Sequence, residues 1–129
     1  MKAYTDILQS KILAEILPIE SADMKWYFWK SEIDAPKLPT FGYGKEAAET
    51  CKSTEVVYLP CWSLATLLGA LPDKVLIDGH FWSLSIGRKG ISYLGYMTYD
   101  GQLHLSVEND NLIDACYEMI LKLKEQKLI

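Results

Sequence analysis

The sequence predicts an α+β fold in which an antiparallel β-meander of three to five strands packs against about three helices. Helical periodicity is found near the two ends and in the middle of the chain. After Asp73 the pattern changes to short strand-like runs separated by glycine-containing turns. The length of 129 residues and the apolar fraction of 50% indicate a single domain, residues 1–129, with one hydrophobic core.

The N-terminal helix is expected from Thr5 to Leu17. Its apolar residues share one face, namely Ile7, Leu8, Ile12 and Ile16. Thr5 is a candidate N-cap, because its hydroxyl can accept a bond from an unpaired backbone N–H. Pro18 is expected to end the helix, since the residue before a proline is driven out of the α region.

A strand is expected next, at Lys25–Trp29, because three of its five residues are large aromatics with β preference. A continued helix is the alternative, because two of the tryptophans are spaced i, i+3. Alternation sends Trp26 and Phe28 to one side of a strand and Tyr27 and Trp29 to the other, and one pair could be exposed. Exposed aromatic side chains are favoured anchors in protein interfaces, so these four residues are the candidate partner-binding set. The competing interpretation is a sheet covered on both sides, or a loop folded over it.

The segment Ser31–Thr54 is expected to be a loop, because it lacks periodicity and contains prolines and glycines. Lys45–Cys51 could form a short helix within it. A short strand is expected at Glu55–Leu59. A strongly apolar central helix is expected to follow, from the Pro-Cys-Trp-Ser start at Cys61 through Trp62–Leu71.

The second half of the chain predicts the meander. Four strands are expected, at Val75–Ile77, His80–Ile86, Ile91–Tyr99 and Leu103–Val107. The predicted turns are Asp78-Gly79, the segment from Gly87 to Gly90, and Asp100-Gly101. The last of these is a two-residue hairpin signal, because both central residues of that turn need φ > 0.

The chain ends in an expected helix from Asn111 to Lys127, with Asp110 or Asn111 as N-cap. Its apolar stripe consists of Leu112, Cys116, Met119, Ile120 and Leu123.

Charge and composition argue against several classes of partner. The formal net charge is −4, and the densest basic group, at Lys122, Lys124 and Lys127, alternates with glutamates on a helix. Binding through phosphates needs a basic footprint, so nucleic acid is not an expected partner. No apolar stretch reaches the ~20 residues that cross a bilayer. Charges within the first 17 residues argue against a signal peptide, and three widely spaced cysteines suit a reduced, cytoplasmic protein.

A search for catalytic chemistry finds no constellation. On strand alternation His80 shares a face with Trp82 at the edge of the core, while His104 faces solvent, opposite Val107. Cys51 and Cys61 are ten residues apart with no histidine near either, so neither a metal nor another cofactor is expected.

Single nucleophiles are weakly supported. Cys61 is the one candidate, since a helix start favours a thiolate, and burial is the competing interpretation. Ser63 and Ser83 lack a nucleophile elbow. The segment Gly42-Tyr43-Gly44-Lys45 lacks the spacing of a phosphate loop, and Cys116 is expected to pack on the inner stripe of the last helix.

Four motifs resemble a family of small uncharacterised proteins encoded in gut anaerobic bacteria, frequently in prophages and other mobile elements. They are Gln9-Ser10-Lys11, Ser21-Ala22-Asp23-Met24, Leu59-Pro60-Cys61-Trp62-Ser63-Leu64 and Asp114-Ala115-Cys116-Tyr117-Glu118-Met119. The resemblance spans most of the chain but not the segment from Ser31 to Thr54. The common form of the third motif has alanine at position 61, which argues against a catalytic thiol. The family implies no activity.

The expected function is therefore that of a non-enzymatic accessory or protein-interaction domain of phage or mobile-element origin, with a protein partner or a second copy as its ligand. One alternative is a small enzyme whose site is assembled only in the fold. It would need a pocket that gathers His80 or His104 with a carboxylate or with Cys61. The other alternative is a nucleic-acid mimic or a nucleic-acid-associated protein.

Overall fold

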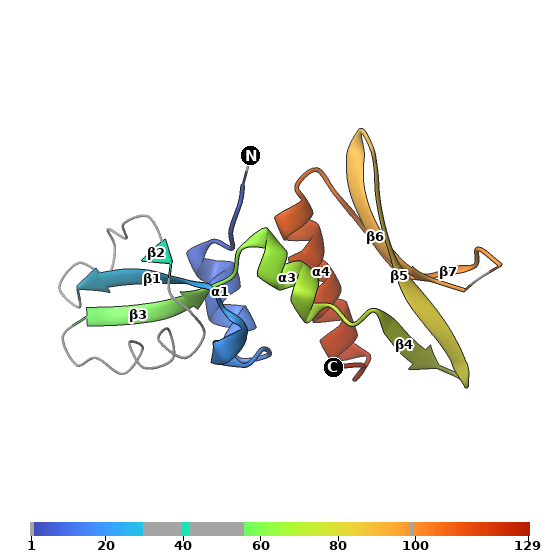
Figure 1. Cartoon of the computed structure of the whole chain (residues 1–129), viewed down its shortest axis with the longest axis horizontal. Coiled ribbons are helices and arrows are strands. Elements are labelled where there is room, and N and C mark those ends of the chain that lie inside the picture. The colour runs from blue at the N-terminus through green and yellow to red at the C-terminus, as the bar shows by residue number, and fades with distance from the viewer. Residues whose placement is uncertain (1, 30–39, 42–55, 99) are drawn as a thin grey trace. The chain divides into compact units, whose positions relative to one another are not determined.

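A computed structural model describes residues 2–29, 40–41, 56–98 and 100–129. The chain forms two compact units, each described by itself below: Ala3–Thr66, and Met1–Lys2 together with Leu67–Ile129. The expected α+β class is confirmed, with helices near both ends and in the middle of the chain and an antiparallel meander after Asp73 (Figure 1). The strands fall into two antiparallel sheets, one of three strands and one of four, in the described ranges.

The first unit contains helix α1 (Ile7–Leu13), the 3₁₀ turn η1 (Ile19–Ser21) and three strands. The strands are β1 (Met24–Trp29), β2 (Thr40–Phe41) and β3 (Val56–Cys61). The strand expected at Lys25–Trp29 is confirmed, and it pairs along its length with β3. Strand β2 corrects part of the loop expected at Ser31–Thr54, because Thr40 and Phe41 pair with Lys25 and Met24 of β1. The rest of that segment, with its alternative helix at Lys45–Cys51, lies outside the described residues.

Helix α1 begins at a different cap from the one expected. Asp6 is the N-cap and forms a capping box with Gln9. Thr5 is instead fully buried, where its hydroxyl contacts the Ser10 hydroxyl at 2.8 Å and accepts the Trp62 N–H at 3.1 Å. The α-helix also ends at Leu13, because the N–H groups of Glu15 and Ile16 donate to carbonyls three positions back, in tighter i→i−3 bonds.

Helix α3 spans Leu64–Ala70, a shorter range than the expected Trp62–Leu71. The three residues assigned to its start do not form helix. Cys61 ends β3, and the next two residues pair with the start of the chain, where the Thr5 N–H donates to the Trp62 carbonyl at 3.0 Å. Trp62 is fully buried, and its Nε1 donates to the Ser21 hydroxyl at 2.9 Å.

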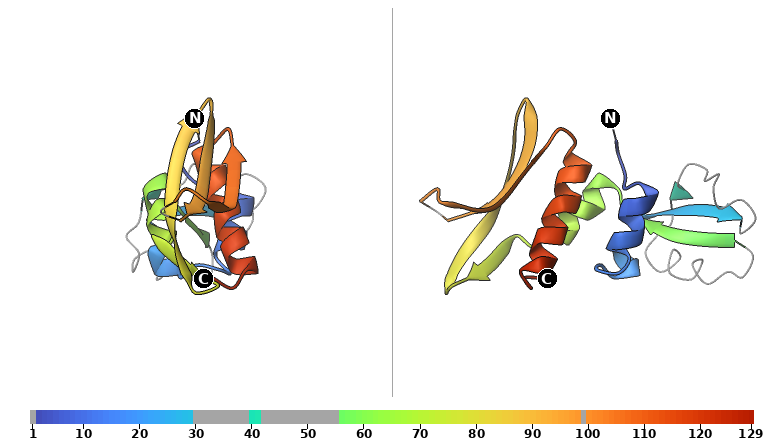
Figure 2. Two further views of the ribbon diagram at one scale, coloured as in Figure 1. Left: turned by 90° about the vertical axis from the view of Figure 1, so that its right-hand side faces the viewer. Right: turned by 180° about the vertical axis from the view of Figure 1, so that it is seen from behind.

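The second unit is a four-stranded meander with a helix on one face (Figures 1 and 2). Its strands are β4 (Lys74–Ile77), β5 (His80–Lys89), β6 (Ile91–Met97) and β7 (Leu103–Asn109). Helix α4 (Leu112–Glu125) packs against β6 and β7. We call the side that bears the buried Val75, Leu94, Tyr96 and Val107 the helix-side face, and the opposite side the open face.

The C-terminal helix matches its prediction. Asn111 is the N-cap and accepts bonds from the N–H groups of Ile113 and Asp114. The expected apolar stripe is buried apart from Leu112, which is half-buried. In the part of the chain that is described, no helix combines the length and the apolar character needed to cross a membrane.

The turns of the meander correct two expectations. The two-residue turn with φ > 0 at both positions is Asp78-Gly79, where Ile77 pairs with His80. Asp100-Gly101 is not such a turn. The Thr98 N–H donates to the Gln102 carbonyl at 2.9 Å, which leaves a connection of three residues. Only its last residue, Gly101, has a positive φ in the described chain, at 88°.

The turn expected from Gly87 to Gly90 is also shorter than predicted. Strand β5 continues through Lys89, and Gly90 alone, with φ 76°, separates it from β6.

Candidate functional site

The aromatic cluster proposed as a partner-binding set is not uniformly exposed. Trp26 is buried, its Nε1 donates to the Thr5 carbonyl at 3.1 Å, and its ring meets Tyr4 edge-on at 5.7 Å. It belongs to the core with Met24 and Cys61. Trp26 is therefore not a surface anchor. The side chains of Tyr27, Phe28 and Trp29 lie outside the described residues, so their part of the interpretation stays a prediction.

Cys61 is not at a helix start but at the end of β3. Its side chain is fully buried, and its Sγ donates to the Thr5 carbonyl at 3.4 Å. Burial raises the pKa of this thiol to about 11, which suppresses the thiolate that acts as a nucleophile. Cys116 packs on the inner face of α4 as expected, and burial raises its pKa to about 12. Neither thiol is placed for chemistry.

Ser63 lies in a network around Asp23. The carboxylate accepts bonds from the Ser63 N–H at 2.9 Å, from the Ser63 hydroxyl at 2.5 Å and from the Thr66 hydroxyl at 3.0 Å. These bonds tie the approach to β1 to the first turn of α3. Among the described residues no group of three or more His, Cys, Asp and Glu side chains could hold a metal ion.

The two histidines lie on the same face of the meander. His80 begins β5 beside Trp82, as alternation predicts, although it is exposed. His104 is exposed as expected, but its predicted placement opposite Val107 is wrong. His104 pairs with Tyr96 and Val107 pairs with Leu94, so a bulge puts both on the helix-side face. Its ring then meets the Trp82 ring with centroids 5.3 Å apart.

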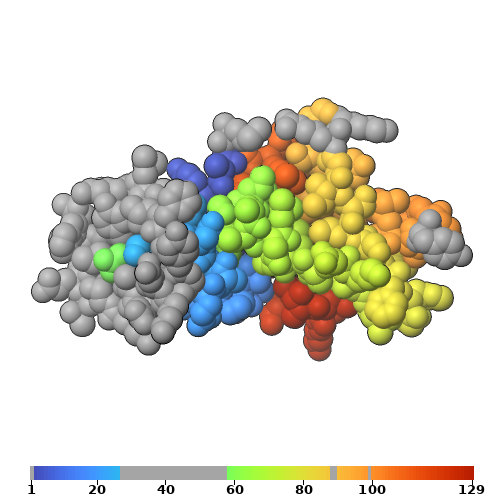
Figure 3. Space-filling view, viewed as in Figure 1, coloured from blue at the N-terminus to red at the C-terminus, as the bar shows by residue number. Residues whose placement is uncertain are grey.

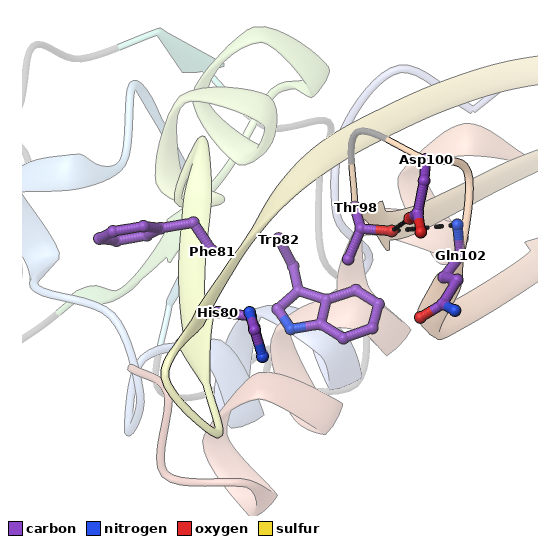
Figure 4. Close-up of a pocket in the computed structure, with 6 residues that line it drawn as sticks. All are labelled: His80, Phe81, Trp82, Thr98, Asp100 and Gln102. Atoms are coloured by element: carbon purple, nitrogen blue, oxygen red, sulfur yellow. Dashed lines mark hydrogen bonds between the residues drawn. The ribbon is translucent and has the colours of Figure 1, made fainter.

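A pocket of about 460 Å³ lies at the turn end of the sheet. It is lined by His80, Phe81, Trp82, Thr98, Asp100 and Gln102. Figure 4 shows His80 and Trp82 on one side of β5 and the Phe81 ring on the other. The start of β5 and the β6–β7 connection meet here, because the β4–β5 turn and the β6–β7 turn lie at the same end of an antiparallel meander.

Hydrogen bonds order the polar side of this pocket. The Thr98 hydroxyl donates to the Asp100 carboxylate and accepts the Gln102 N–H at 3.1 Å (Figure 4). The bond from Thr98 lowers the pKa of Asp100. Across the pocket, the Trp82 Nε1 is buried and has no hydrogen-bond partner among the described residues.

The pocket partly meets the condition set for an enzyme, because it gathers His80 with the carboxylate of Asp100. No hydrogen bond between these two side chains is present in the described part of the chain. Cys61 does not line the pocket. The arrangement can bind a ligand, but it lacks the base-to-orienting-group contact of a nucleophilic or acid–base site.

The open face carries large apolar side chains. Phe81 is 68% exposed, Leu76 is 55% exposed and Leu103 is 53% exposed. Phe81 and Leu76 are direct cross-strand partners, and Leu103 pairs with Met97 in the neighbouring row. We call Leu76, Phe81, Met97 and Leu103 the apolar patch. Strand β5, coloured yellow, reaches the surface in the space-filling view (Figure 3). Sequence reasoning missed this patch because a short apolar strand does not reveal which of its faces is covered.

Comparisons of the chain with protein-family models, with curated proteins and with solved structures found no match. The functional argument therefore rests on the pocket and on the apolar patch.

Proposed function

We propose that the chain is a non-enzymatic protein-interaction domain of phage or mobile-element origin, which binds a partner protein through the apolar patch. The origin rests on the resemblance of the four sequence motifs. The interaction rests on one structural observation, the three large apolar side chains that are more than half exposed on the face opposite the one against which α4 packs. Exposed apolar patches of this kind mark interaction surfaces.

The size of the patch favours a transient partner over an obligate dimer. A stable complex buries about 800 Å² on each partner, whereas functional patches on monomers are roughly 300–600 Å². Four side chains that are partly exposed fall in the lower class. We therefore expect a second protein that offers an apolar surface of its own and dissociates readily.

The face of the sheet is a better candidate than its β7 edge. Leu105 interrupts that edge with φ 53° at the bulge, and the Lys122 Nζ donates to the Ser106 carbonyl at 2.9 Å. Bulges and lysines are features that discourage the addition of another strand. An approach through side chains on the open face avoids both.

The test places the photo-crosslinker benzoylphenylalanine at position 81, and in a control at position 86. Ile86 is 45% exposed on the same strand but belongs to the helix-side face. We expect a protein that crosslinks at position 81 and not at position 86, and that binds again when purified. Phe81→Ser should then weaken the purified complex at least tenfold, and Ile86→Ser should not, since central aromatic anchors carry ~2 kcal/mol or more.

Equal crosslinking at both positions would contradict the proposal, as would equal effects of the two substitutions. If the chain crosslinks to itself and forms a dimer that depends on Phe81, the ligand of the apolar patch is a second copy of the chain and not another protein.

A small enzyme is the second candidate function. It is supported by the presence of His80 and Asp100 in one pocket, but not by any hydrogen bond between them.

A further inference from the structure

The pocket at the turn end of the meander has the size of a small-molecule site. Its volume of about 460 Å³ lies within the roughly 300–1,000 Å³ that is usual for ligand pockets. The lining is divided, with the Trp82 ring on one side and the side chains of Thr98, Asp100 and Gln102 on the other (Figure 4). A ligand that fits must therefore offer one apolar face and several polar groups.

Trp82 supplies both an aromatic surface and a donor. Its Nε1 has no partner among the described residues, and an unsatisfied buried donor costs free energy that an acceptor on a ligand can recover. Figure 4 shows the nitrogen edge of the indole beside the His80 ring. His80 is exposed, so its side chain can rotate away from the indole without disturbing the core.

The charge of the pocket limits the ligand further. Asp100 is the one formally charged residue, other than histidine, among the six lining residues, and none of the six is lysine or arginine. An anion such as a phosphate would meet this carboxylate without a compensating cation. A cation would gain little attraction here, because Asp100 is exposed to water and already accepts a hydrogen bond from the Thr98 hydroxyl.

Gln102 completes the set, since its side-chain amide can both donate and accept. Hydroxyl groups have the same dual capacity, so a ring that carries several of them can bond to the carboxylate, the amide and the indole N–H together. We propose that this pocket binds a small uncharged polyhydroxylated ring, a sugar, whose C–H face packs on Trp82 and whose hydroxyls bond to Asp100 and Gln102. The Trp82 side of this site lies on the helix-side face, and Phe81 is the one lining residue that the site shares with the apolar patch.

The experiment follows the indole N–H resonance of Trp82 in the ¹⁵N-labelled full chain, assigned by its loss in Trp82→Phe. Glucose, galactose and N-acetylglucosamine are the neutral probes, and choline and inorganic phosphate are the charged probes. We expect a saturable shift with at least one sugar at roughly millimolar Kd. Asp100→Asn should weaken this binding about tenfold, which is the difference between a charged and a neutral acceptor.

Asp78→Asn is the matched control, because it removes the same charge at the neighbouring β4–β5 turn outside the pocket lining. It should leave sugar binding unchanged. The proposal is overturned if no sugar gives a saturable shift, if choline or phosphate alone binds, or if Asp100→Asn has no more effect than Asp78→Asn. Leu103→Ser, on the open face, should not alter sugar binding, so failure of this proposal and failure of the proposed function are separable.

Discussion

Replacing Asp23 with alanine should be among the most destabilising polar substitutions in the first unit. Its carboxylate accepts three hydrogen bonds from Ser63 and Thr66, both about forty positions away in the chain. Ser63 precedes α3, and its own hydroxyl accepts the Thr66 N–H at 3.4 Å, so Asp23 orients the residue that caps the helix.

The expected loss of unfolding free energy follows from the interactions that Asp23→Ala removes. Loss of an N-cap costs about 1 kcal/mol, and each hydrogen bond to a charged group contributes about 1.5–3 kcal/mol. The site is only part-buried, so water replaces some of these bonds. We expect Asp23→Ala to lower the free energy of unfolding by about 2–4 kcal/mol. Asp23→Asn and Ser63→Ala should each cost about 1 kcal/mol, since each preserves part of the network.

Urea denaturation followed by tryptophan fluorescence measures these differences. Glu20→Ala is the control, because Glu20 is exposed and nearby in the chain, and it should stay within about 0.5 kcal/mol of the wild type. The reasoning is refuted if Asp23→Ala is no more destabilising than Glu20→Ala, or if Asp23→Asn costs as much as Asp23→Ala.

Two further predictions concern the thiols and the last helix. Since burial raises the pKa of Cys61 from 9.0 to about 11, the folded state holds this proton more tightly than the unfolded state. Stability from this group is complete below pH 9 and is lost as the pH rises from 9 to about 11. By pH 10 the loss should reach about 1.4 kcal/mol, and Cys61→Ala should remove that part of the pH dependence in urea titrations. If Cys61→Ala keeps the full pH dependence, the thiol is not its source. In the last helix, Asn111→Ala should lower the free energy of unfolding of the second unit by about 1 kcal/mol. Asn111→Asp should lower it by less, because aspartate keeps the oxygen that accepts the cap hydrogen bonds. Equal losses for the two substitutions would argue against the cap.

The elements of this fold were predictable where one local signal decides them. The apolar stripe and the Asn111 cap define α4, and the run of aromatics defines β1. The start of α1 was not predictable in detail. Thr5 and Asp6 are both good N-caps by type, and the choice depends on Thr5 being needed in the core by Ser10 and Trp62.

Distant contacts explain the remaining errors. The Pro-Cys-Trp-Ser segment has helical spacing, yet Cys61 pairs with Met24 in the sheet. Tertiary pairing therefore overrides local propensity there. Likewise, two Asp-Gly pairs have the same turn chemistry, but only Asp78-Gly79 forms the two-residue turn. The length of each connection is set by the register of the strands, which local sequence does not contain.

One contact of the pocket wall, between His104 and Trp82, was hidden from sequence reasoning by a backbone irregularity. In a regular strand His104 and Val107 would lie on opposite faces. Leu105 adopts φ 53° at the bulge opposite Gly95, which brings His104 to the face of Trp82. A non-glycine residue in this left-handed region costs about 1–2 kcal/mol, and such strain is concentrated at functional sites. A regular β7 would remove the cost and turn His104 to the open face, where it would no longer contact the wall of the pocket. The strained residue therefore places His104 against Trp82, which is one of the residues that line the pocket.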